Sequence, residues 1–239
     1  MRLAKVGVVI PAAGSGKRMG SSVNKQFLLL AGKPVLAYTV EVFQSSPFVE
    51  EIVIVGAKED LPLISGLVKT HTYSKVAKIT VGGAIRQASV YTGVKALSAE
   101  IGRVVVHDGA RPLLTLEVFH RFLANAQGFP AAITAIPLKD TVKRVDDNGW
   151  VRETPVRDTL RAVQTPQLFD RHVLLDAHEQ AMAKGFVGTD DASILEWLGY
   201  PVKVLAGAEE NIKVTTPQDL WLAERIIEVR GQKSEVRQT

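Results

Sequence analysis

The 239-residue sequence contains no cysteine, few aromatic residues (6%) and no long uncharged apolar run. The absence of cysteine excludes disulfide scaffolds, thiolate zinc sites and cysteine nucleophiles, and it suits a reducing, cytoplasmic location, which we expect. A membrane-spanning helix needs about 20 mostly apolar residues, so no membrane partner is expected. Neither charge sign dominates, because 29 Lys and Arg face 25 Asp and Glu, for a net charge of +4.

Apolar runs alternate with helical patterns through the first half of the sequence. Residues 6–10 are a continuous apolar run that Pro11 ends, which is typical of a strand buried on both faces. Similar patterns predict strands at 52–55, 78–81, 104–106 and 131–136, and helices at 34–45, 60–68, 86–98 and 117–126. This alternation predicts an α/β fold with a mainly parallel, doubly wound, Rossmann-like sheet.

The pattern changes after Pro137. Residues 141–145 and 150–153 read as two strands joined by a turn that contains Asn148 and Gly149. Both strands carry charges at alternate positions, so they do not form an interior hairpin. We interpret 138–158 as a β-arm that projects from the domain. Because an isolated two-stranded ribbon is marginally stable in water, we expect the arm to pack on a second subunit and form a homodimer.

The remaining sequence continues the same domain. Strands are expected at 160–163, 202–205 and 212–214, and helices at 171–183 and 190–198, the latter with Thr189 as its cap. A last helix begins with Pro217 at its first position. Without a linker or a repeat, residues 1–230 are expected to form one domain with the arm, and 231–239 a flexible tail.

A glycine-rich segment, Pro11 to Gly20, follows the first strand. Ligands of open α/β sheets bind at the carboxyl ends of strands, and backbone N–H groups of small residues can cradle phosphates there. The dinucleotide fingerprint fails because Gly20 comes one residue late, and the phosphate loop of NTPases fails because Arg18 follows Lys17. What remains is a glycine loop with the nearby cations Lys17, Arg18 and Lys25, which favours a phosphorylated ligand.

Several motifs together resemble one family of nucleotidyltransferases, the 2-C-methyl-D-erythritol 4-phosphate cytidylyltransferases of the non-mevalonate isoprenoid pathway. The glycine loop with Met19 and the Lys-Gln-Phe of 25–27 begins the match. The later motifs are Gly82-Gly83, Arg86, Ser89, 106–112, 140–143, Gln164-Thr165-Pro166-Gln167, 189–193 and 211–215. The glycine loop is shared by many nucleotidyltransferases, whereas the later set in this order is far more specific.

The resemblance implies that a substrate phosphate attacks the α-phosphorus of CTP and releases pyrophosphate, with Mg²⁺ or another divalent cation held mainly by the CTP phosphates. The implied catalytic residues are Arg18, Lys25, Lys213 and Arg157. The implied CTP-binding residues are Pro11, Ala12, Ala13, Gly14, Ser15, Gly16, Lys25, Gly82, Gly83 and Ser89. The implied residues for the polyol phosphate are Asp108, Arg111, Thr141, Arg157, Thr165, Thr189 and Lys213.

The residues themselves support parts of this assignment. Two anions must meet in such a reaction, so fixed positive charge and backbone donors are required, and a covalent nucleophile is not. Asp108 follows a buried strand and is expected to face substrate, with only a weak claim to the metal, whose protein ligands are unknown. His107 is expected to be structural, because the attacking phosphate is already deprotonated. Thr141 and Arg157 are implied to reach across the dimer.

Two other functions are consistent with parts of the sequence. A related enzyme could use ribitol 5-phosphate or another sugar phosphate, since the nucleotide half of the site would be the same. A non-catalytic module for nucleotides or nucleic acids would need a continuous basic face with stacking aromatics, and the scattered Trp150, Trp197 and Trp221 do not predict one. We therefore expect small-molecule partners and no nucleic acid.

Overall fold

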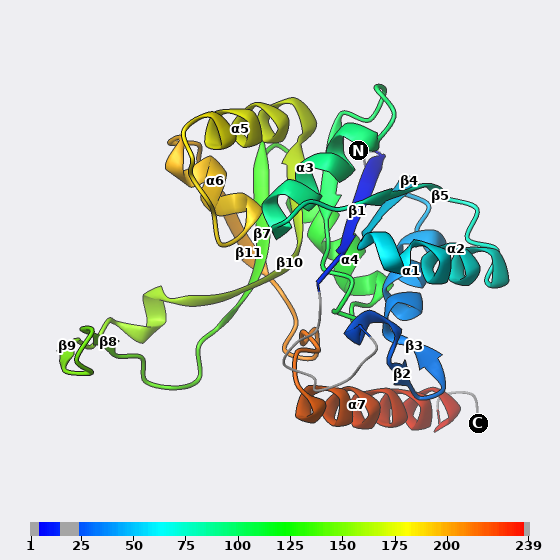
Figure 1. Ribbon diagram of the computed structural model, residues 1–239. Coiled ribbons are helices and arrows are strands. Elements are labelled where there is room, and N and C mark those ends of the chain that lie inside the picture. Colours follow the sequence, from blue (N-terminus) through cyan, green and yellow to red (C-terminus); the bar gives the residue numbers. More distant parts are fainter. Residues whose placement is uncertain (1–4, 15–23, 237–239) are drawn as a thin grey trace.

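A seven-stranded sheet forms the centre of the computed structural model, which describes residues 5–14 and 24–236 (Figure 1). The strand order is β11-β7-β10-β6-β1-β4-β5. The strands are β1 (Val6–Ala12), β4 (Val49–Gly56), β5 (Val76–Val81), β6 (Arg103–Val106), β7 (Ala131–Pro137), β10 (Arg161–Asp170) and β11 (Lys203–Ala206). Two-stranded pairs are formed by β2 (Leu29–Leu30) with β3 (Lys33–Pro34) and by β8 (Arg144–Val145) with β9 (Val151–Glu153).

The sheet is mainly parallel, as the sequence predicts. β1 pairs in parallel with β4 and β6, β4 with β5, and β7 with β11. β10 is the exception, because it runs antiparallel to both β6 and β7. The chain leaves the sheet after β7, forms the arm and re-enters the sheet as β10. The antiparallel strand therefore directly follows the arm in the sequence.

Helices cover both faces of the sheet, which confirms the doubly wound α/β prediction (Figure 1). One face packs on α1 (Val35–Ser45), α2 (Leu61–Thr70) and α4 (Leu116–Asn125), and the other on α3 (Arg86–Ala96), α5 (Arg171–Ala183) and α6 (Asp191–Trp197). Successive strand residues point to opposite faces. Thus Val8 and Ile10 of β1 join the first core, and Val9 joins the second.

The arm extends away from the sheet in Figure 1, with β8 and β9 at its far end. At its turn Asp146 accepts hydrogen bonds from the backbone N–H of Asn148 (3.0 Å) and of Trp150 (2.9 Å). Gly149 has φ +82°, a conformation that a side chain would strain. The arm carries four large apolar side chains that are exposed: Val145, Trp150, Val151 and Val156.

Two expectations are wrong in this part of the chain. Residues 212–214 are a loop rather than a strand, and the backbone N–H of Val214 donates to the carbonyl of Ala110 at 2.8 Å. The final helix, α7 (Pro217–Val236), runs six residues into the segment expected to be a tail. Val214 joins Leu30, Val35, Leu113 and Ala223 in a third small core, and this packing holds the loop and α7 against the domain.

Short 3-10 turns η2 (Lys25–Phe27), η3 (Lys58–Asp60) and η4 (Arg157–Thr159) complete the list of elements. Within the described part of the chain, no helix combines the length and the apolar character needed to cross a membrane.

Candidate active site

Two adjoining pockets lie at the carboxyl ends of the parallel strands. The first has a volume of about 380 Å³ and the second about 400 Å³. Loops after β1, β5 and β6 line the first, and β10 with the start of α6 lines most of the second. Arg86, Asp108 and Lys213 line both pockets, so these three side chains form a shared wall between them.

The first pocket is built around the glycine loop. Pro11, Ala13, Gly14 and Lys25 line it, whereas Ala12 is buried in the core. Arg18, Ser15 and Gly16 lie outside the described residues. Sequence reasoning gave no role to Gln26, which is buried beside the loop: its side-chain amide donates to the carbonyl of Ala12 and to that of Gly14 (3.1 Å). Gln26 therefore anchors the loop from behind.

The opposite side of this pocket is the start of α3. The Ser89 hydroxyl accepts a hydrogen bond from the backbone N–H of Gly83 (3.1 Å) and donates to the carbonyl of Ile85 (3.1 Å). A Cβ at Gly82 would lie 2.6 Å from Ser89 Oγ and 2.9 Å from Ala13 Cβ. Only glycine therefore permits this close approach of the loops. The first turn of α3 lines the pocket, where helix N–H groups favour an anion.

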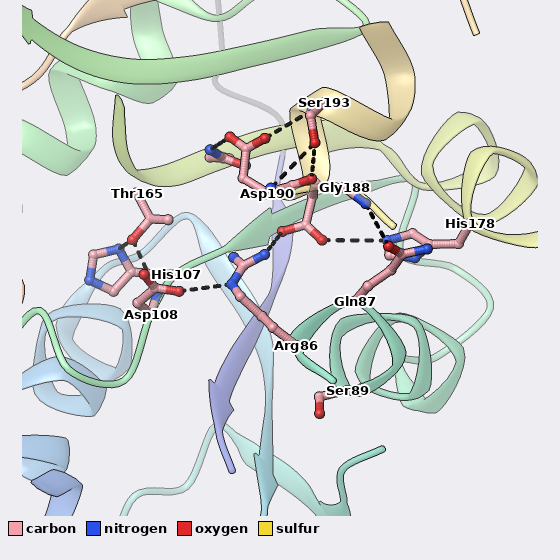
Figure 2. A network of polar contacts seen from close by, with 12 residues as sticks. Arg86, Gln87, Ser89, His107, Asp108, Thr165, His178, Gly188, Asp190 and Ser193 are labelled. Atoms are coloured by element: carbon pink, nitrogen blue, oxygen red, sulfur yellow. Dashed lines mark hydrogen bonds and ion pairs between the residues drawn. The ribbon is translucent and has the colours of Figure 1, made fainter. Parts of the chain in front are cut away.

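Asp108 is the centre of the shared wall. Its carboxylate lies 3.2 Å from Arg86 Nε (Figure 2). Lys213 Nζ lies 2.7 Å from the same carboxylate, and Arg111 Nε lies 3.9 Å from it. Burial alone would raise the pKa of this carboxyl, but Arg86 and then Lys213 outweigh burial and hold the pKa well below its ordinary value. Asp108 is therefore an anion that fixes three cations in place.

Thr165 and His107 support Asp108 from behind. The Thr165 hydroxyl accepts from the backbone N–H of Asp108 (3.1 Å) and lies 3.1 Å from His107 Nδ1 (Figure 2). His107 Nε2 is 3.3 Å from the carbonyl of Arg111. Burial lowers the pKa of His107 to about 4. A neutral imidazole that donates from Nε2 and accepts at Nδ1 satisfies every contact. His107 is thus structural, as expected.

The lowered pKa of His107 predicts a pH-dependent stability. Between its ordinary value of 6.5 and its folded value of about 4, the unfolded chain binds a proton at His107 that the folded chain does not. The free energy of unfolding should therefore fall as pH drops through this window, by up to about 3 kcal/mol from this group. His120, whose pKa burial also lowers, adds to the trend in the same direction.

Urea unfolding measured from pH 7 to pH 4.5 tests this, with His107→Gln as the matched variant. The variant should be less stable at pH 7 but should lose less stability on acidification. Equal slopes in the two proteins would contradict the assignment.

The second pocket takes its polar groups from β10 and α6. Gln164, Thr165 and Gln167 line it, together with Thr189 and Arg111. Thr189 is not the helix cap: Asp190 caps α6 by accepting from the backbone N–H of Ser193 (2.9 Å). Because Thr189 does not cap the helix, its exposed side chain is available to a ligand in the second pocket. The two glutamines belong to the Gln164-Thr165-Pro166-Gln167 motif, but nothing in the sequence distinguishes their roles from that of Thr165.

Two residues predicted to bind the polyol phosphate do not line either pocket of their own chain. Thr141 and Arg157 lie exposed on the arm, and Arg157 donates to the carbonyl of Lys139 at 3.0 Å. Lys213 does reach the site, but from the loop after β11 rather than from a strand. Across residues 5–14 and 24–236, no group of three or more His, Asp and Glu side chains is arranged to hold a metal ion.

Comparisons with known proteins agree with this architecture. The pattern that defines the family described as 2-C-methyl-D-erythritol 4-phosphate cytidylyltransferase matches residues 6–229. A protein of that name from Symbiobacterium thermophilum is 49% identical over 228 residues, which cover 95% of each chain. Another from Halalkalibacterium halodurans is 47% identical over 220 residues, or 92% of this chain and 96% of that one.

Solved structures give the same result. The crystal structure of 4-diphosphocytidyl-2C-methyl-D-erythritol synthase from Anaerococcus prevotii is similar with a TM-score of 0.84 and 32% identity, over 94% of this chain and 96% of that one. The cytidylyltransferase from Thermus thermophilus has a TM-score of 0.76 and 34% identity, over 93% and 98%. The sheet, the glycine loop and the two pockets are those of an α/β nucleotidyltransferase. Within that class, the chain belongs to the 2-C-methyl-D-erythritol 4-phosphate cytidylyltransferase family.

Proposed function

We propose that this protein transfers the cytidylyl group of CTP to 2-C-methyl-D-erythritol 4-phosphate. The observation that carries the proposal is the pair of adjoining pockets with one shared wall of Arg86, Asp108 and Lys213. The first pocket would hold CTP and the second the polyol phosphate. A phosphate oxygen of the polyol then attacks the α-phosphorus, a new P–O bond forms, and the bond to the bridging oxygen breaks to release pyrophosphate.

The chain's contribution is electrostatic. Two anionic reactants repel each other, and charge builds up around the crowded phosphorus, so fixed cations and N–H donors lower the barrier. Lys25 and Lys213 both line the first pocket, and the loop and the first turn of α3 add backbone donors. In the proposal Lys25 and Arg18 stabilise the transition state, while Lys213 positions the polyol phosphate.

A divalent cation, Mg²⁺ in the proposal, fits the donor set. Mg²⁺ is commonly held by one or two carboxylates together with substrate phosphates and water. Asp108 is the carboxylate that lines the first pocket, and it is already committed to Arg86 and Lys213. The triphosphate would therefore supply most ligands. When bound, the ion would neutralise phosphate charge and favour departure of pyrophosphate.

The proposal includes a cytoplasmic homodimer joined through the arm. The exposed Trp150, Val151 and Val156 would be covered by a second copy, which would remove apolar surface from water. Thr141 and Arg157 would then reach the partner's second pocket, where the planar guanidinium of Arg157 can bind the polyol phosphate with two hydrogen bonds.

A mixing experiment tests the crossed position of Arg157. Arg157→Ala should raise the KM for the polyol phosphate, and Lys25→Ala should abolish turnover in its own site. If each site combines Lys25 of one chain with Arg157 of the other, a mixed dimer retains one intact site. Assayed at a polyol phosphate concentration far below the raised KM, equal amounts of the two variants, exchanged and reassembled, should then regain about a quarter of wild-type activity. Activity no greater than the mean of the separate variants would place Arg157 in the site of its own chain.

The reaction itself is tested by pyrophosphate release. The purified protein is incubated with Mg²⁺ and each nucleoside triphosphate, paired with 2-C-methyl-D-erythritol 4-phosphate or ribitol 5-phosphate. Rapid release is expected only with CTP and the methylerythritol phosphate. Faster release with ribitol 5-phosphate would refute the proposed substrate, and release with no pair would refute the proposed reaction.

A further inference from the structure

A buried carboxylate stands directly behind the shared wall. Asp191, the first residue of α6, is 0% exposed, and its Oδ2 lies 2.7 Å from Arg86 NH1. On its other side Oδ1 is 3.5 Å from Nε2 of His178 in α5, which is also 0% exposed (Figure 2). Neither residue lines either of the two pockets described above. The route from this Asp191–His178 pair to the pockets therefore runs through Arg86.

Arg86 is held from two directions. Its Nε donates to Asp108 and its NH1 donates to Asp191, so both the position and the plane of the guanidinium are fixed. Within the described ranges NH2 makes no hydrogen bond to the chain, and the Arg86 side chain is 29% exposed and lines both pockets. A planar guanidinium with free N–H donors matches phosphate oxygens.

Such an arrangement is costly for the fold alone. Removing an aspartate fully from water carries a desolvation penalty that a single ion pair often fails to recover. Burial would raise the pKa of Asp191, but Arg86 outweighs burial and lowers that pKa, so the carboxylate stays charged. Lys213 already compensates Asp108 at 2.7 Å, so Asp108 needs no second cation as close as Arg86. The exposed part of Arg86 is thus better explained by a ligand.

We infer that Asp191, buried beside His178, is a positioning residue that fixes Arg86 so that its NH2 group donates to a phosphoryl oxygen where the two pockets meet. The inference rests on the proposed function, because that junction is where the new P–O bond would form. A preoriented donor there would strengthen its interaction as charge develops on phosphorus. A side chain held by buried neighbours does not have to be ordered during the reaction.

A double-mutant cycle between Asp191→Asn and Arg86→Gln tests the inference. Asp191→Asn keeps the size of the side chain and removes its charge, whereas Arg86→Gln leaves a shorter, neutral and still polar side chain. We expect Arg86→Gln to lower kcat by about 100-fold and Asp191→Asn by about tenfold or more, with smaller changes in either KM. The double variant should be no slower than Arg86→Gln alone. Asp176→Asn, an exposed carboxylate on α5 bound to Gln180, is the control and should match wild type.

Three measurements keep the result decisive. If folded Asp191→Asn turns over within twofold of wild type, the inference is wrong, and it is also wrong if the double variant is a further tenfold slower than Arg86→Gln. If Asp191→Asn alone does not fold, the double variant, which leaves no uncompensated charge at this pair, can still contradict the inference by being a further tenfold slower than Arg86→Gln. The affinity for CTP, measured by calorimetry, should be weakened by a similar factor in both single variants. This measurement tests the inference even if the wild-type protein releases no pyrophosphate. A wild-type protein that releases no pyrophosphate would refute the proposed function and not this inference.

Discussion

Replacing Lys25 with alanine is expected to lower turnover by about 100-fold or more, the loss that follows removal of one preorganised charge stabiliser from a transition state. Lys25 lines the first pocket from the short turn η2. Its neighbours are tied down on both sides: Asn24 donates to Asp60 at 2.6 Å, and Gln26 donates to the loop carbonyls of Ala12 and Gly14. The backbone that carries Lys25 is thus fixed before a ligand arrives.

Steady-state kinetics with varied CTP measure this loss. Because the proposed role belongs to the transition state, kcat should fall much more than the KM for CTP rises. Lys58→Ala is a matched control, since Lys58 also lies in a 3-10 turn after a parallel strand but is exposed and lines neither pocket. A Lys25→Ala enzyme with near-normal kcat would remove this lysine from the chemistry.

The sheet could be predicted from the sequence because buried parallel strands are continuous apolar runs. Residues 6–10 and 104–106 are such runs, and both lie at the centre of the sheet. The direction of β10 could not be predicted, since the four-residue pattern at 160–163 says nothing about which neighbours it joins. The prediction of a strand at 212–214 was wrong for a related reason. Ile212 and Val214 are apolar because they pack with α7, not because they belong to a sheet.

Residues that follow strands directly are the part of the candidate site that the sequence could place beside a pocket. The glycine loop after β1, Gly83 after β5 and Asp108 after β6 all line the first pocket. The supporting contacts were not predicted, because they join residues far apart in the chain: Arg86 meets Asp191 across 105 positions, and Asp108 meets Thr165 across 57. No local periodicity encodes such pairs. The roles of Thr141 and Arg157 depend on a second chain and stay predictions.

Replacing Asp108 with asparagine is expected to reduce both stability and activity. The substitution leaves the guanidinium of Arg86 and the ammonium of Lys213 facing each other without the anion that separates them. Breaking a buried ion pair on one side costs about 3–5 kcal/mol, and partial exposure of Lys213 (37%) reduces this to about 2–3 kcal/mol here. Urea unfolding of the variant and wild type at pH 7 measures the difference.

Activity should fall further than stability explains. Under conditions in which Asp108→Asn is fully folded, we expect a loss of about 100-fold in kcat/KM for the polyol phosphate, because Lys213 and Arg86 lose their shared position at the junction of the pockets. Asp170→Asn is the matched control, since it breaks the pair with Arg103 at the opposite end of β6. That control should lose stability but retain turnover. If both variants lose activity only in proportion to their loss of stability, the shared wall contributes to folding alone. If only Asp108→Asn loses turnover, the shared wall contributes to the transfer reaction. The comparison is direct because the same kind of ion pair is broken in both proteins and only its location differs.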